Sequence, residues 1–158
     1  MNIITQVINS TNMHLLEQVA LLRAIEKREN KEEKLTRILE EEIDKQSKFT
    51  QNSNMDFIVA QLNIDSNTPI GYCRGKVDPI EPSIYECLGV YVRSHYRESG
   101  VGQHLLQTQE DFAHRYGHNT LMTTVSIMNS NSIAMLENRG FELGESMPGI
   151  LEAIKALK

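Results

Sequence analysis

Two glycines one residue apart, Gly100 and Gly102, stand directly before an amphipathic segment in the stretch RESGVGQHLL (residues 97–106). Apolar residues keep helical spacing from Val101 to Tyr116, and Gly117 follows as a helix stop. The preceding stretch IYECLGVYV (residues 84–92) is typical of a strand. The sequence therefore predicts a strand, a loop that needs bare backbone, and a helix in direct succession.

Such a junction is suited to binding an anion. The first amides of a helix have no intrahelical partner and the helix dipole is positive there, so a glycine-rich entry lets an anion approach several N–H groups at once. The stretch lacks the Lys-Ser/Thr pair of a P-loop and the third glycine of a dinucleotide-binding fingerprint. It predicts a site for the phosphate of another ligand, and a plain glycine turn is the alternative.

The rest of the chain alternates between strand and helical periodicity. Strands are expected at residues 2–9, 55–64, 70–78, 84–92, 120–127 and 140–143, and helices at 13–25, 31–46, 101–115 and 131–138. The tail, residues 149–158, favours a helix by composition, although a strand there would complete a hairpin. The pattern predicts an α/β fold with a mixed sheet and helices on both faces.

Length and charge narrow the function further. The 158 residues, 40% of them hydrophobic, predict one domain over residues 1–158. A net charge of -5 and the lack of a Lys/Arg stripe argue against nucleic acid as the main partner. No apolar run approaches the ~20 residues that span a bilayer, and the first residues do not resemble a signal peptide, so we expect a cytoplasmic protein with no membrane partner.

Cysteine and histidine spacing gives no sign of a metal site. Cys73 and Cys87 lack a Cys-x-x-Cys pattern and are expected to be buried thiols. The five histidines form no repeated i, i+4 pair with a carboxylate, and His95 lies near the glycine loop. We therefore expect no metal.

Two stretches resemble the Gcn5-related N-acetyltransferases. VYVRSHYRESGVGQHLL (residues 90–106) is similar to their acetyl-CoA motif, Arg/Gln-x-x-Gly-x-Gly/Ala, through Arg97, Gly100 and Gly102. NSNSIAMLENRGFE (residues 129–142) is similar to a later helix and turn of that family, with Glu137 and Gly140 among the matches. The resemblance implies a central, mostly antiparallel sheet and a final strand in the tail.

The resemblance also implies acetyl-CoA as co-substrate. Amides at the helix start would surround the CoA pyrophosphate, and the strand end would offer backbone groups to the pantetheine arm and to the thioester oxygen. The residues that this implies for acetyl-CoA binding are Val90, Tyr91, Val92, Arg97, Glu98, Ser99, Gly100, Val101, Gly102, Gln103 and Asn129. For Asn129, a helix N-cap is an alternative role.

The implied reaction is acetyl transfer to a primary amine by direct attack. Glu86 is at the position that resembles the general-base glutamate of some relatives, and an ion-paired surface carboxylate is the alternative. Where many relatives have a tyrosine that protonates the CoA thiolate, this chain has Leu136. Water or another side chain can replace that donor, because a thiol with pKa ~8.5 leaves tolerably as thiolate. A non-catalytic acyl-CoA-binding sensor or assembly module is the alternative function.

The acceptor is expected to be a small-molecule or peptide amine. The acidic stretch EEEID (residues 40–44) predicts a cationic one, and a solvated helix face balanced by Lys34, Arg37 and Lys45 is the alternative. Three tyrosines on the predicted strands could place further polar groups at the site, and the alternative is that their rings pack in the core: Tyr72, Tyr85 and Tyr91. A second copy of the chain, forming a homodimer, is a further candidate partner.

Overall fold

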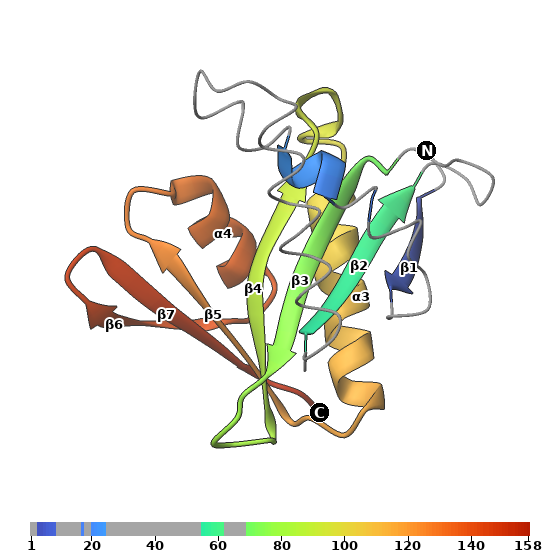
Figure 1. Cartoon of the computed structure of the whole chain (residues 1–158). Coiled ribbons are helices and arrows are strands. Elements are labelled where there is room, and N and C mark those ends of the chain that lie inside the picture. Colours follow the sequence, from blue (N-terminus) through green and yellow to red (C-terminus); the bar gives the residue numbers. More distant parts are fainter. Residues whose placement is uncertain (1–2, 9–16, 18–19, 25–54, 62–68) are drawn as a thin grey trace. The chain divides into compact units, whose positions relative to one another are not determined.

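The computed structural model describes residues 3–8, 17, 20–24, 55–61 and 69–158 (Figure 1). Contacts divide the chain into two compact units. Unit 1 comprises residues 1–74 and 90–108, and unit 2 comprises residues 75–89 and 109–158. The strands are β1 (Ile4–Ile8), β2 (Met55–Gln61), β3 (Gly71–Val77), β4 (Ile84–Val92), β5 (Thr120–Ser126), β6 (Glu142–Met147) and β7 (Ile150–Ala156), and the helices are η1 (Ser94–Tyr96), α3 (Val101–Arg115) and α4 (Ser130–Asn138).

Most element predictions that fall on these residues are confirmed, with small shifts at the ends, whereas β6 overlaps the strand predicted at 140–143 only at residues 142–143. The bounds of β4 and α3 are those predicted, and the ambiguous tail is a strand, β7. Residues 20–24 are helical and bury Ala20, Leu22 and Ala24. The predicted helix over 31–46 and the EEEID stretch lie outside the described residues.

Hydrogen-bonded neighbours in the sheet follow the order β1-β2-β3-β4-β5-β7-β6. The pairs β1–β2, β5–β7 and β6–β7 are antiparallel, and β4–β5 is parallel. This mixed sheet, accompanied by helices, confirms the α/β fold class. The division into two units does not test the prediction of a single domain, because β3, β4 and α3 each have residues in both units.

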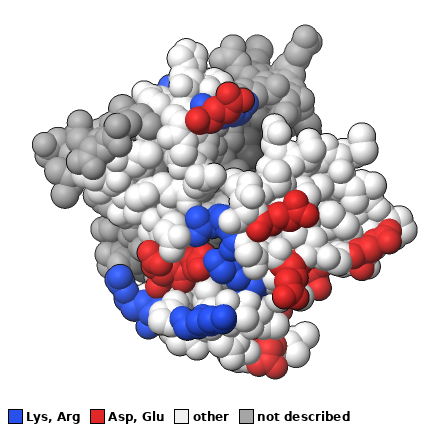
Figure 2. Space-filling view, turned by 180° about the vertical axis from the view of Figure 1, so that it is seen from behind, with Lys and Arg blue, Asp and Glu red and all other residues white. Residues whose placement is uncertain are grey.

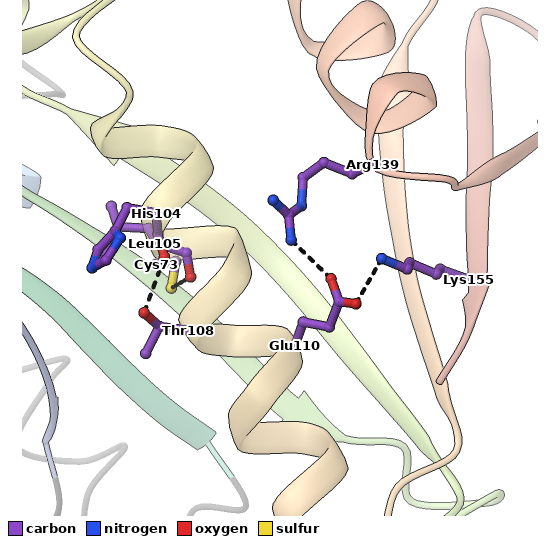
Figure 3. A network of polar contacts seen from close by, with 7 residues as sticks. All are labelled: Cys73, His104, Leu105, Thr108, Glu110, Arg139 and Lys155. Atoms are coloured by element: carbon purple, nitrogen blue, oxygen red, sulfur yellow. Dashed lines mark hydrogen bonds and ion pairs between the residues drawn. The ribbon is translucent and has the colours of Figure 1, made fainter. Parts of the chain in front are cut away.

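In unit 1, the first half of α3 packs through its apolar residues. Val101, Leu105 and Leu106 are buried, as the helical spacing predicted. Polar contacts add to this packing: the Cys73 thiol donates to Leu105 O at 3.6 Å, and the Thr108 hydroxyl donates to His104 O at 3.0 Å (Figure 3).

In unit 2, α4 lies beside β5 and β7 (Figure 1), and one apolar cluster joins them to the second half of α3. Alternate residues of the strands point into this cluster, because side chains on a strand alternate between its faces. Its buried members are Tyr85, Cys87, Ala113, Leu121, Val125, Leu136, Phe141 and Ala153. The strands and helices of unit 2 are therefore held by a common core.

Both cysteines are buried and neither forms a disulfide, as predicted. Burial, with a smaller contribution from the charges of Glu110 and Glu86, raises the pKa of the Cys87 thiol to about 12. Cys87 is therefore a protonated core residue at neutral pH. In the part of the chain described here, no helix is long and apolar enough to cross a membrane.

Candidate functional site

The loop between β4 and α3, where an anion site is predicted, belongs to unit 1. The first hydrogen bond of α3 runs from His104 N to Gly100 O at 3.0 Å, so the amides at 101–103 have no intrahelical acceptor. Gly100 has a φ of +86°, which favours glycine, and a Cβ built there would meet no atom within 4 Å. The helix N-terminus therefore has open space beside a glycine, as an anion site requires.

The same loop contains a second residue with left-handed backbone. Glu98 has a φ of +63°, a region that non-glycine residues seldom occupy. The Ser99 hydroxyl donates to Tyr96 O and Arg97 N donates to Ser94 O, so the loop is held by hydrogen bonds within itself. Strained backbone thus coincides with the predicted anion site, an association that is common at ligand sites.

Arg97 lies along the end of β4. Its Nε donates to Val92 O at 3.0 Å, and its guanidinium carbon is 5.8 Å from the centroid of the Tyr91 ring. These contacts fix the exposed side chain at the loop, where a positive charge would favour an anion.

The predicted pantetheine strip, residues 90–92, is anchored to β3. The rings of Tyr91 and Tyr72 are 5.7 Å apart, and Arg93 N donates to Ile70 O. Gly71 makes this approach possible, because a Cβ there would be 2.7 Å from Tyr91 O and 3.2 Å from Leu105 Cδ1. The sequence predictions did not include Gly71, since its role depends on which strand and helix face it.

Glu86 forms an ion pair. Its carboxylate is 2.9 Å from Lys76 Nζ on β3, with 26% of the side chain exposed. This is the alternative arrangement considered for Glu86, and it leaves a general-base role untested. Opposite it in the β4–β5 ladder is Met122.

Asn129 caps α4. Its side-chain oxygen accepts from Ser132 N at 3.1 Å, and its own amide donates to Ser126 O. The N-cap role is thus present, whereas contact with CoA stays a prediction. Leu136, seven residues later, is 4% exposed and belongs to the apolar cluster of unit 2.

The predicted site residues divide between the two units. Residues 90–92 and 97–103 belong to unit 1, whereas Glu86 and Asn129 belong to unit 2. Tyr72, Tyr85 and Tyr91 are all buried, as expected for core rings.

One polar network in unit 2 was not predicted. The Glu110 carboxylate on α3 accepts from Arg139 Nη2 at 2.9 Å and from Lys155 Nζ at 2.6 Å (Figure 3). Partial burial raises the pKa of Glu110, but the hydrogen bonds from the two cations outweigh it, so the pKa is below its ordinary value. The network joins α3, the turn after α4, and β7. Helix spacing alone marks Glu110 only as a polar residue.

Charged side chains of both signs are interspersed on the face in Figure 2. Across the described ranges, no group of three or more His, Cys, Asp or Glu side chains is arranged to hold a metal ion.

Comparison with known proteins places these features in a family. A family model described as the acetyltransferase (GNAT) family matches residues 19–141. No curated protein matches the chain. Similar folds include an N-acetyltransferase from Staphylococcus aureus Mu50, with 16% identity, a TM-score of 0.76 and 100% of both chains covered. The PaiA N-acetyltransferase from Thermoplasma acidophilum, solved in complex with coenzyme A, has 19% identity and a TM-score of 0.70 with 99% of both chains covered.

A third similar structure is the ribosomal-protein-S18-alanine N-acetyltransferase from Escherichia coli. Its identity is 15% and its TM-score 0.68, over 99% of this chain and 95% of that one. At such identities the likeness concerns the fold alone.

Proposed function

The chain belongs to the acetyltransferase (GNAT) family, and from this premise we propose that it transfers an acetyl group from acetyl-CoA to a primary amine by direct attack. The proposal places acetyl-CoA as co-substrate at the β4–α3 junction. It is supported by similarity to the Thermoplasma fold that was solved with coenzyme A.

The observation that carries the proposal is the start of α3. The amides at 101–103 have no intrahelical acceptor, Gly100 leaves open space, and Arg97, in the same loop, is held at the end of β4. This set of donors fits a pyrophosphate, which needs several N–H groups and a positive charge within reach. Those residues would hold the phosphates of CoA.

Acetyl-CoA, when bound, supplies an activated acetyl group as a thioester. A backbone amide of residues 90–92 would donate to the thioester oxygen, on which negative charge develops. Glu86 would take the proton of the attacking amine, directly or through water. To do so, its carboxylate would have to release Lys76, with which it forms an ion pair. Leu136 has no proton to give, so water would protonate the departing thiolate.

Binding is tested with Gly102→Asp, which places bulk and negative charge at the proposed phosphate site. Isothermal calorimetry should show CoA binding to the wild type and a loss of about 100-fold or more in the variant. Gly144→Asp is the control, because a Cβ at Gly144 on β6 meets nothing within 4 Å. Equal CoA affinity of Gly102→Asp and the wild type would refute the phosphate site.

Turnover is tested by thiol release from acetyl-CoA with a panel of amines. Glu86→Gln should lower the rate and remove the rise of activity with pH, while CoA affinity stays the same. Glu142→Gln, at an exposed carboxylate on β6, serves as the control. If Glu86→Gln kept the wild-type rate and pH profile, another group or none would act as base.

A second candidate function is a non-catalytic acyl-CoA sensor or assembly module. Leu136 favours it, because an apolar and nearly buried residue occupies the position where many relatives have the proton donor. Calorimetric CoA binding without thiol release over the whole amine panel would support this function and exclude the transferase.

The acceptor is proposed to be a cationic small-molecule or peptide amine, in keeping with the acidic EEEID stretch. Better turnover of neutral or acidic acceptors than of polyamines at low salt would contradict this. A cytoplasmic location is also proposed, supported by two buried cysteines that form no disulfide.

A further inference from the structure

The parallel ladder between β4 and β5 is short. It comprises three residue pairs, Ile84 with Thr120, Tyr85 with Leu121, and Glu86 with Met122. Both strands continue beyond it, and β5 stays paired with β7 as far as Ser126. Pairing on one side of β5 therefore ends within the strand, while pairing on its other side goes on.

At the first position after the ladder, a side chain rather than the backbone makes the hydrogen bond between the two strands. The Thr123 hydroxyl donates to Cys87 O at 2.8 Å, and both residues directly follow the last pair, Glu86 with Met122. In a continuing ladder, a backbone amide would donate to such a carbonyl. A hydroxyl extends farther from its strand than an amide does, so this bond satisfies the carbonyl without requiring the ladder spacing of ~4.8 Å.

The backbone of β4 changes conformation two residues later. Gly89 has a φ of +144°, which side-chain-bearing residues rarely adopt, and a Cβ there would meet nothing within 4 Å. Gly89 is exposed, whereas Cys87 is buried. The hydroxyl bond thus holds a buried residue two positions before an irregular part of the strand.

We propose that Thr123 is a positioning residue that ends the β4–β5 ladder directly before Cys87 and thereby sets the course of the β4 backbone at residues 87–89. These residues lead along the chain into the strip at 90–92, whose backbone would contact CoA. The consequence for CoA rests on the proposed function, but the consequence for the strand does not.

Two substitutions separate the hydroxyl from the shape of the side chain. Thr123→Val keeps the β-branched shape and removes the donor, and Thr123→Ser keeps the donor. Thr124→Val is the matched control, because the neighbouring Thr124 is exposed and pairs with Glu152 on β7. All four proteins are compared by thermal melting to establish that they are folded.

Hydrogen–deuterium exchange in the ligand-free protein gives the first readout. In Thr123→Val, we expect exchange across residues 87–89 to accelerate about 10-fold, with Thr123→Ser and Thr124→Val close to wild type. Wild-type exchange in Thr123→Val, or the same increase in Thr124→Val, would overturn the proposal.

CoA binding gives the second readout. Thr123→Val should weaken CoA binding and raise the KM for acetyl-CoA about 10-fold, with kcat changed less than about 3-fold and restoration by Thr123→Ser. Unchanged affinity in Thr123→Val, with a wild type that binds CoA, would overturn the positioning role. If the wild type bound no CoA but exchange responded as expected, the proposed function would fail and the role of Thr123 in ending the ladder would stand.

Discussion

Gly75→Ala should destabilise the protein strongly, because Gly75 on β3 faces the ring of Tyr85. An ideal Cβ at position 75 would lie 2.3 Å from Tyr85 Cε1 and Oη and 2.4 Å from Cζ, whereas carbon atoms in contact are ~3.5 Å or more apart. The ring or the strand would have to move by about 1 Å. Tyr85 is 0% exposed, and its ring lies 5.8 Å from Phe112 and 5.4 Å from His118. The ring therefore has no simple way to move aside.

Overpacking of this kind costs about 1–3 kcal/mol, and the enclosure of Tyr85 favours the upper end. For a chain of this length, about 3 kcal/mol corresponds to a Tm lower by about 6–12 °C, measured by circular dichroism. Gly144→Ala is the control and should change the free energy of unfolding by about 1 kcal/mol or less, since its Cβ meets nothing within 4 Å.

A double-mutant cycle attributes the effect to the ring. Leucine at position 85 lacks the ring atoms that clash, so Gly75→Ala should cost little in a Tyr85→Leu background, with a coupling energy of about 2 kcal/mol. Additive losses of stability, or a Tm of Gly75→Ala within about 2 °C of wild type, would refute the steric explanation.

Two further predictions concern unit 2. Glu110→Gln should cost about 1–2 kcal/mol at pH 7, between the values for exposed and buried pairs. Because folding lowers the pKa of Glu110, this contribution is present above the ordinary pKa of the carboxyl and is lost as pH falls through the lowered pKa. The Tm difference between wild type and variant should therefore shrink as the solution is acidified, and a difference that stays constant would contradict this. Leu136→Tyr should lower the Tm by about 2–12 °C through overpacking. It should not accelerate thiol release, and a rise near ~10²-fold would instead show that the phenol donates a proton.

Local signals in the sequence were enough to predict α3. The glycines before it, the apolar spacing within it and Gly117 after it, whose φ is +85°, all act within a few residues. The tail was different: its leucine, alanine and lysine residues favour a helix, yet pairing with β5 and β6 makes residues 150–156 a strand. Resemblance to a family, rather than propensity, favoured the strand.

Contacts that depend on the register between strands could not be predicted from the sequence. Thr123 and Cys87 are 36 residues apart, and only the register of the β4–β5 ladder, whose last pair is Glu86 with Met122, makes them neighbours. The ion pair of Glu86 with Lys76 likewise requires knowing which residues of two strands are neighbours. The position of Arg97 in the glycine motif marked it as a site residue, but its hydrogen bond to Val92 O could not be predicted from the sequence.

The two ends of the sheet differ in how far apart their paired strands lie along the chain. β6 and β7 are joined through Pro148 and Gly149, whose φ of +81° suits the third position of a type II turn. β1 and β2 pair across residues 9–54. Closing the long connection between β1 and β2 costs more entropy than closing the two-residue turn between β6 and β7. Hairpins with short turns form within ~1–10 μs. The β6–β7 hairpin is therefore expected to form early in refolding, and the β1–β2 pairing late.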